Sequence, residues 1–222
     1  MIDYFSRGPL VTLRDNVAYK ARTKIQRLFM NSLDPKSDEK VVDIGVTPDI
    51  EHKETNYFEK NYPYKEKVTI TSIEDCNFLV EMYGLETFVM TKAKESFPFE
   101  DNEFNLLFCS AVLEHVGNRQ DQKFFINECL RVAKRGLLVT PYRYFPLEMH
   151  TFIPFLHWLP WGAFQKIVKV IKRKDGQFWA DINNLNLLSK RNIKEMGFTN
   201  FKVCFIRTCG FKSNLVLIFD KR

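Results

Sequence analysis

The sequence predicts an α/β fold with a doubly wound, mostly parallel sheet that ends in an antiparallel C-terminal strand pair. First, short β-rich runs alternate with segments of helical periodicity through most of residues 38–200, which is typical of parallel strands joined by right-handed crossovers. Second, Phe104–Ser110 has the apolar character of a parallel strand that is covered on both faces. Third, Gly210 separates the β-rich runs Lys202–Arg207 and Asn214–Phe219, which favours antiparallel pairing.

Length and composition indicate one globular domain. The chain has 222 residues, 45% of them hydrophobic and 27% charged, which suits a folded domain with a sizeable core and excludes disorder as the main state. The net charge is only +6, and the basic residues are scattered apart from residues 166–174. Nucleic acid is therefore not an expected partner.

Cysteine and histidine content predicts a reduced protein without a metal site. The five cysteines have no metal-ligand spacing, and the whole chain has four histidines. We therefore expect free thiols in a cytoplasmic protein and no bound metal. The first 15 residues lack the apolar core of a signal sequence. The most apolar stretch, residues 153–164, is too short and too often broken by proline for a transmembrane helix.

An N-terminal helical extension, residues 1–37, is expected to precede the main domain, residues 38–222. Residues 1–15 show no regular pattern. From Asn16 to about Leu33, apolar residues recur with a helical period and basic residues occupy the other faces. This pattern predicts an amphipathic helix.

The strands and helices of the main domain follow from apolar runs and turn residues. Gly84 and Gly136 are expected to end the second and third of its helices. Five strands are predicted before residue 142: Lys40–Ile44, Val68–Ile73, Thr87–Met90, Phe104–Ser110 and Leu137–Thr140. The predicted helices are Thr55–Asn61, the segment between Asp75 and Gly84, the segment from Asn118 through Ala133 to Gly136, and Asn186–Met196.

Residues 142–180 interrupt this alternation with an aromatic, proline-rich segment that we expect to form a lid insertion. Within it, residues 164–174 are amphipathic, with Phe164, Ile167 and Ile171 in one stripe and lysines on other faces. Such a helix either packs on its own core with a solvated basic side or lies on an anionic membrane surface. The second interpretation predicts peripheral contact with the inner face of the membrane.

Four stretches of the chain carry a family resemblance: Val41–Gly45, Phe97–Phe104, Ser110–Val116 and the closing strand pair. Over roughly residues 38–220, the chain resembles the class I S-adenosylmethionine-dependent methyltransferases, which have a Rossmann-like fold. The Ser110–Val116 stretch, with the Phe-Pro-Phe loop before it, is similar to the branch that acts on sugars, lipids and small metabolites. The resemblance therefore implies S-adenosylmethionine as cofactor and a small-molecule or glycan acceptor.

The resemblance also implies cofactor-binding roles for residues at the ends of the first four strands. Glu74 would accept hydrogen bonds from both ribose hydroxyls, since a carboxylate offers two oxygens. Two plainer alternatives stay open: Asp43 and Gly45 only form a tight turn, or Asp75 rather than Glu74 is the ligand. Ala93 would contact adenine through its backbone N–H. Asp43, Gly45 and Val46 would form the turn after the first strand, where the backbone approaches the cofactor. Ser110 and Ala111 would line the methionine part of the cofactor.

Three residues depart from the family pattern and predict a weakened cofactor site. Thr47 and Asp49 stand where the glycine-rich loop usually continues with glycine, so their side chains would narrow the approach. Lys92 stands where an aspartate often accepts a bond from the adenine amino group, and lysine has only donors. Because S-adenosylmethionine carries no phosphate, a rebuilt loop can still hold it.

Histidines are the candidate bases. His115 follows the fourth strand beside the expected pocket, and His150 lies with His157 in the segment that would cover the acceptor. On one helix, His150 and His157 would share a face. An imidazole with a pKa near about 6.5 can take a proton from a hydroxyl, so His115 and His150 are the candidate catalytic residues. The plainer alternative is that they hold the loop and the lid in place.

The sequence therefore predicts a methyltransferase that O-methylates a small-molecule, saccharide or lipid-linked acceptor. The alternative, favoured by Thr47, Asp49 and Lys92, is a catalytically inactive binding or scaffold protein on the same fold. A nucleotide-sugar or NAD enzyme is disfavoured because the chain lacks the three-glycine pyrophosphate turn. The sequence does not predict the oligomeric state.

Overall fold

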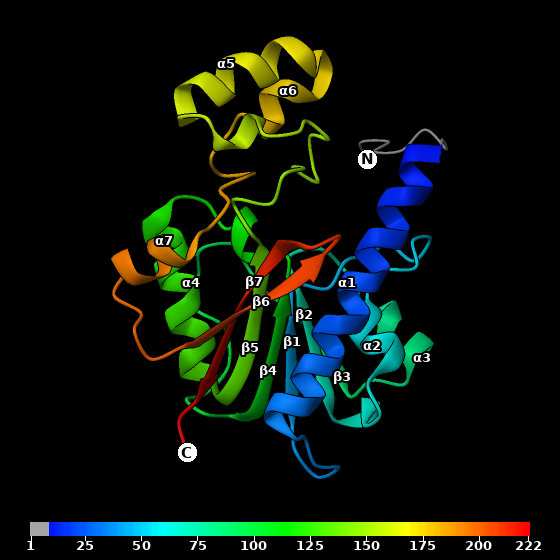
Figure 1. Ribbon diagram of the computed structural model, residues 1–222. Helices are drawn as coiled ribbons and strands as arrows, with labels where there is room; N and C mark the ends of the chain where they lie inside the picture. The colour runs from blue at the N-terminus through cyan, green and yellow to red at the C-terminus, as the bar shows by residue number, and fades with distance from the viewer. Residues whose placement is uncertain (1–8) are drawn as a thin grey trace.

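The computed structural model describes residues 9–222, apart from the side chains of residues 9–14, 173 and 174. Seven strands form one sheet in the order β3-β2-β1-β4-β5-β7-β6 (Figure 1). Only the pairs that involve β7 are antiparallel, which confirms the predicted Rossmann-like sheet. The strands are β1 (Val41–Ile44), β2 (Val68–Ser72), β3 (Thr87–Met90), β4 (Phe104–Ser110), β5 (Ala133–Pro141), β6 (Lys202–Thr208) and β7 (Phe211–Asp220).

β1 lies at the centre of the parallel part of the sheet. All four of its residues are buried, and Val41 pairs with Val68 of β2 on one side and with Leu106 of β4 on the other. The order of the strands reverses between β1 and β4. In open α/β sheets, ligands bind outside the carboxyl ends of the strands at such a reversal, so the topology alone places the site at the end of β1.

Helices cover both faces of the sheet. On one face lie α1 (Pro9–Leu33), α2 (Tyr57–Asn61) and α3 (Phe78–Tyr83); on the other lie α4 (Arg119–Val132) and α7 (Lys190–Glu195). Each face has its own apolar core. The first contains Ile25, Phe29, Phe58 and Leu79 against Val41 and Ile70, and the second contains Ile126, Cys129 and Ile193 against Val42 and Leu138.

Some predicted boundaries were wrong. α1 begins at Pro9 rather than Asn16, because proline is well tolerated in the first turn of a helix; the predicted irregular segment up to residue 8 lies outside the described residues. α7 begins only after Ser189, whose side chain forms a capping box with Asn192, so residues 186–189 are not helical.

Gly136 does not end a helix, contrary to the prediction. α4 stops at Val132, and β5 starts at once with Ala133, so Gly136 lies within the strand. A Cβ at Gly136 would lie 2.7 Å from the Phe219 ring and 2.8 Å from the carbonyl oxygen of Leu107. The glycine is needed for close packing between β5 and its neighbours, and glycine alone cannot distinguish that role from a helix stop.

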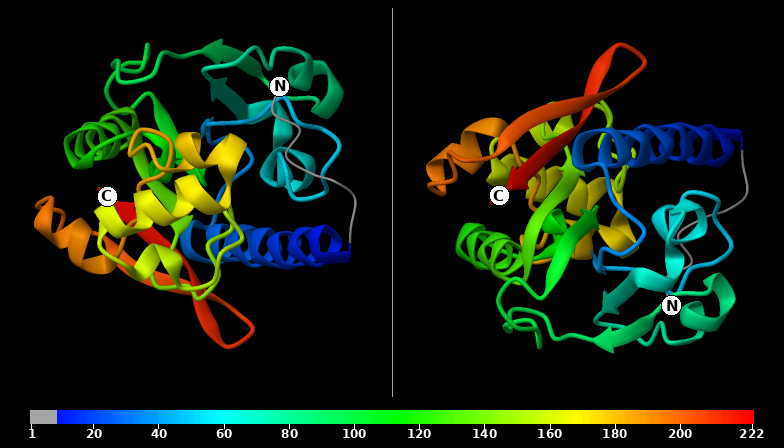
Figure 2. Two further views of the ribbon diagram at one scale, coloured as in Figure 1. Left: turned by 90° about the horizontal axis from the view of Figure 1, so that it is seen from above. Right: turned by 90° about the horizontal axis from the view of Figure 1, so that it is seen from below.

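Residues 142–180 lie over the carboxyl ends of the strands (Figure 2). They contain the short helix η3 (Leu156–Trp158), α5 (Trp161–Ile171) and α6 (Arg173–Trp179). This segment has a small apolar core of its own, made by Leu156, Phe164, Val168, Trp179 and Ala180 together with Leu185 and Leu187. Among the described residues, no helix has the length and apolar character needed to cross a membrane.

Candidate functional site

A cavity of about 500 Å³ opens at the carboxyl ends of β1, β2, β3 and β4. Its size falls within the range of small-molecule sites, which is about 300–1,000 Å³. Five of the seven residues assigned to the cofactor line it: Gly45, Val46, Glu74, Ala93 and Ala111. We call this space the cofactor cavity.

Gly45 is required by the backbone at the end of β1. Its φ of +95° is rarely adopted by residues with a side chain, and a Cβ there would overlap the Cγ2 atom of Val112. The N–H groups of Gly45 and Val46 both donate to the carbonyl oxygen of Thr71, at 2.9 and 3.0 Å. The turn is therefore held against β2, and it leaves a backbone wall on the cavity.

Thr47 and Asp49 do not narrow the cofactor cavity, contrary to the prediction, because neither residue lines it. The Thr47 N–H donates to the side chain of Asn56, and the Asn56 amide donates back to the Thr47 carbonyl oxygen. The Asp49 carboxylate accepts from the N–H of Glu51 and contacts the His52 ring. The loop is thus held by hydrogen bonds among its own residues and Asn56.

Glu74 lines the mouth of the cofactor cavity and is exposed, whereas Asp75 does not line it. The Asp75 carboxylate instead accepts from the N–H of Asn77, ahead of α3. Lys92 lines the cavity from the side of β3 and lies 3.6 Å from the Glu95 carboxylate. The assignment of ribose binding to Glu74 stays a prediction, and the geometry leaves its carboxylate accessible for that role.

Asp43 and Ser110 lie outside the lining of the cofactor cavity. Asp43 is buried, and burial together with the neighbouring Glu59 raises the pKa of its carboxyl group well above the usual range. Ser110 accepts a hydrogen bond from the Arg22 guanidinium of α1. Both residues therefore belong to a polar cluster under α1. Arg22 was missed from the sequence because its partner is 88 positions away.

A second cavity, of about 190 Å³, adjoins the first. Ala111 lines both cavities and has a positive φ of +62°, which is uncommon for a residue with a Cβ. Most of the lining of this second space, which we call the acceptor cavity, comes from α1, the turn after β4, residues 141–150 and the β6–β7 hairpin, and His157 and Leu187 complete it.

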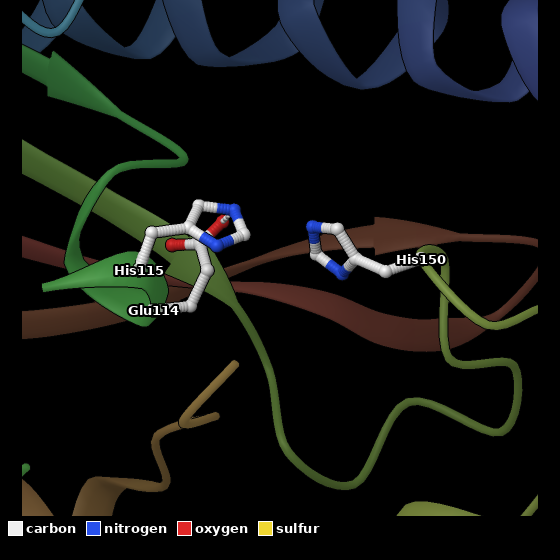
Figure 3. Close-up of side chains that lie close together, drawn as sticks. All are labelled: Glu114, His115 and His150. Carbon is white, nitrogen blue, oxygen red and sulfur yellow. Dashed lines mark ion pairs between the residues drawn. The ribbon is translucent and has the colours of Figure 1, made fainter. Parts of the chain in front are cut away.

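The side chains of Glu114, His115 and His150 lie close together (Figure 3). Glu114 and His115 come from the short helix η2 (Leu113–His115), and His150 reaches toward them from the segment after β5. One ligand-type atom from each side chain lies within 4.8 Å of the other two. Glu114 and His150 line the acceptor cavity, while His115 lines the cofactor cavity, so the cluster spans both.

A methyltransferase-domain family model matches residues 49–140, which include β2 to β5 and η2. Over these residues the chain has a methyltransferase domain, and the order of its strands agrees with a class I, S-adenosylmethionine-dependent methyltransferase. This family uses S-adenosylmethionine. The cofactor cavity lies at the carboxyl ends of the strands beside the reversal in strand order, where open α/β sheets bind ligands. No curated protein sequence matches the chain.

Solved structures support the fold of the methyltransferase domain. Magnesium protoporphyrin IX methyltransferase from Synechocystis PCC 6803, crystallised with S-adenosylhomocysteine, is 11% identical, with a TM-score of 0.57 over 97% of this chain and 90% of its own. Geranyl diphosphate C-methyltransferase from Streptomyces coelicolor is also 11% identical, with a TM-score of 0.54 over 90% of this chain and 77% of its own. A Rhodobacter sphaeroides protein provisionally named a zinc-dependent alcohol dehydrogenase is 9% identical, with a TM-score of 0.58 over 93% and 98%. At such identities the likeness concerns the fold alone.

The pKa values of the two histidines in this cluster are shifted in opposite directions. Burial lowers the pKa of His115, although the nearby Glu114 opposes the shift. Burial would also lower the pKa of His150, but the Glu148 carboxylate outweighs it, and the pKa of His150 is raised. Despite burial, contact with His150 lowers the pKa of Glu148 to about 2. The His150 ring lies 2.7 Å from the Glu148 carboxylate, whereas the carboxylate nearest to His115, that of Glu114, lies 3.8 Å away.

His150 and His157 do not share a helix face, contrary to the expectation, because His150 lies in a turn and His157 in η3. His157 is buried and donates from Nε2 to the Phe145 carbonyl oxygen at 2.8 Å. Its role in the domain is to tie η3 to the chain that follows β5. His115 and His150 were found from the sequence, whereas Glu114 and Glu148 were not, because both are buried acids without a distinctive pattern.

Proposed function

We propose that the chain transfers a methyl group from S-adenosylmethionine to a hydroxyl oxygen of a small-molecule, saccharide or lipid-linked acceptor. The observation that carries this proposal is the position of Ala111, which belongs to the walls of both cavities. A methyl group at that position could pass from one cavity to the other without a movement of the domain. Placing donor and acceptor in line is the main contribution expected of the protein.

When bound, S-adenosylmethionine supplies an electrophilic methyl group; the acceptor oxygen bonds to its carbon as the carbon–sulfur bond breaks, leaving a methyl ether and S-adenosylhomocysteine. Gly45 and Val46 would give the methionine portion a backbone wall, and Glu74 would accept from the ribose hydroxyls. The hydroxyl proton of the acceptor must leave. The cluster of Glu114, His115 and His150 lies where the two cavities meet, so its side chains would receive that proton.

The acceptor cavity favours a partly apolar acceptor. α1 contributes Val17, Ala18 and Ile25 to its wall, while Asn214 and Ser213 of the hairpin provide polar groups. A hydroxylated ring or a lipid-linked sugar presents both kinds of surface. The composition of the wall therefore supports the proposed O-methylation of a saccharide or lipid-linked acceptor.

We also propose that the chain acts in the cytoplasm at the inner face of a membrane, with α5 as the contact. Phe164 and Val168 of this helix are buried, but Val170 is 75% exposed and Ile171 is 55% exposed. Lys166 and Lys169 are exposed beside them. Apolar side chains rimmed by lysine favour anionic lipid surfaces. Sedimentation with phosphatidylglycerol vesicles tests this: Val170→Asp should release the protein, and equal sedimentation of the variant would refute the contact.

Calorimetry with S-adenosylhomocysteine tests the central proposal. We expect one molecule to bind per chain and to raise the melting temperature, because a ligand of the native state stabilises it by mass action. Glu74→Gln removes the carboxylate that we assign to the ribose and should weaken binding about tenfold or more, the cost of a hydrogen bond to a charged group. Asp75→Asn is the matched control. No heat and no thermal shift at millimolar ligand would favour the inactive scaffold protein.

A further inference from the structure

We infer that Glu114, His115 and His150 bind one divalent transition-metal ion at the junction of the two cavities. The metal-free expectation from the sequence rested on cysteine spacing and on the small number of histidines. The fold brings His150 to the adjacent residues Glu114 and His115, with which it shares no metal-binding spacing in the sequence (Figure 3). The inference deepens the proposed methyl transfer and rests on it for its chemical purpose, but not for the binding itself.

Both imidazoles present the nitrogen that a metal ion needs. His115 Nδ1 lies 2.6 Å from the carbonyl oxygen of Asn184, which can only accept, so Nδ1 carries the proton. His150 Nδ1 lies 2.7 Å from a carboxylate oxygen of Glu148 and donates in the same way. In each ring Nε2 is therefore the atom left for coordination. Metal-binding histidines nearly always have such a carbonyl or carboxylate on their other nitrogen.

Glu114 provides an unpaired carboxylate oxygen at the same place. The residue is 0% exposed, and its Oε2 accepts from the Thr140 hydroxyl at 3.0 Å. Its Oε1 is buried without a hydrogen-bond partner and lies 3.8 Å from His115 Nε2. Leaving a charged oxygen unsatisfied in the interior is costly, and a cation between these two atoms would remove that cost.

The distances allow coordination after a modest adjustment. Ligand atoms at about 2.1 Å from a common ion lie about 3.4 Å apart in a tetrahedral site. The three candidate atoms lie within 4.8 Å of one another, so side-chain movements of roughly 1–1.5 Å would close the site. The positive charge of Arg22, which interacts electrostatically with Glu114, opposes cation binding. The Glu148 carboxylate beside His150 adds negative charge and favours it.

The ligand set selects the kind of ion. Two imidazoles with one carboxylate suit zinc, iron(II) and cobalt(II), and they leave at least one position open. Magnesium prefers oxygen ligands and is not expected to bind here. Since Glu114 and His150 line the acceptor cavity, the open position faces the acceptor. An acceptor hydroxyl bound there would release its proton to water more easily, and His115 and His150 would then act as ligands rather than as bases.

Cobalt(II) binding to the metal-free full-length protein tests the inference without any acceptor. We expect one equivalent to bind, with visible bands of a nitrogen–oxygen site and without the intense near-ultraviolet bands of thiolate ligands. His115→Ala and His150→Ala should each weaken binding by more than the roughly 10–100-fold typical of residues outside the ligand shell. Glu148→Gln, which only orients His150, should fall within that 10–100-fold range. His52→Gln, a histidine outside the cluster, is the matched control.

The outcomes separate this inference from the proposed function. Folding of each variant is checked by its melting curve, and Glu114→Gln provides a third, near-isosteric test. Equal cobalt affinity in the variants and the wild type, a thiolate spectrum, or equally strong magnesium binding would overturn the metal site. S-adenosylhomocysteine binding to the metal-free protein is measured in parallel. If no binding is detected, the proposed function is refuted, and the cobalt result then tests the metal site independently.

Discussion

The cofactor cavity and the acceptor cavity are adjacent, yet they are built in different ways. The cofactor cavity is lined mainly by residues that directly follow β1, β2, β3 and β4, so most contributions are local to one strand end. The acceptor cavity draws on α1, the turn after β4, residues 141–150 and the β6–β7 hairpin. The first depends on topology and backbone conformation, and the second depends on contacts between distant segments.

The largest expected effect concerns the contacts between distant segments. Arg22 of α1 donates to Ser110 and interacts with the buried acids Glu114, Asp43 and Glu59. Arg22→Met leaves these acids without their cation, and we expect the free energy of unfolding to fall by about 3 kcal/mol. Urea denaturation measures this, with the exposed Lys20→Met on the same helix as control. A loss below about 0.5 kcal/mol, the usual range for surface changes, would show that α1 is not held electrostatically.

The next effect concerns the local backbone of the cofactor cavity. Gly45→Ala introduces a Cβ at positive φ and against Val112, and we expect it to cost about 1–3 kcal/mol of stability and to abolish measurable S-adenosylhomocysteine binding. Gly84→Ala is the matched control, because Gly84 also has a positive φ, of +70°, but has open space around its Cβ position. Equal losses in the two variants would mean that the contact with Val112 is unimportant.

This contrast explains what could be predicted from the sequence. Gly45, Glu74 and Ala93 follow predicted strands, and parallel strands bring their carboxyl ends to one edge, so their meeting follows from the order of elements. Arg22 and His150 meet the site only through packing of α1 and of the segment after β5, and periodicity does not encode such docking. Thr47 misled the prediction because its backbone hydrogen-bonds with Asn56, nine positions away, and the residue does not line the cavity.

Substitution of Lys92 is expected to strengthen cofactor binding rather than to weaken it. It lines the cofactor cavity with donors only, where an acceptor would suit an adenine amino group. We expect Lys92→Asp to strengthen S-adenosylhomocysteine binding by up to about tenfold, the worth of one hydrogen bond to a charged group. Lys92→Ala separates the new acceptor from removal of the lysine. Equal calorimetric affinities for Asp and Ala would show that adenine does not reach this position.

The smallest effect distinguishes Asp43 as a structural acid from Asp43 as a cofactor ligand. It lies outside the lining of the cofactor cavity, and burial followed by Glu59 raises its pKa in the folded state, with Arg22 opposing. The folded protein therefore holds a proton that the unfolded chain releases above a pKa of about 3.9. Stability from this group is complete at low pH and falls as pH rises toward the folded pKa, by at most about 1.4 kcal/mol per pH unit. Asp43→Asn, which mimics the protonated acid, should flatten this fall in urea denaturation between pH 4 and 8 while leaving S-adenosylhomocysteine affinity unchanged. If the variant loses affinity for S-adenosylhomocysteine but keeps the wild-type pH dependence of stability, Asp43 is a cofactor ligand rather than a structural acid.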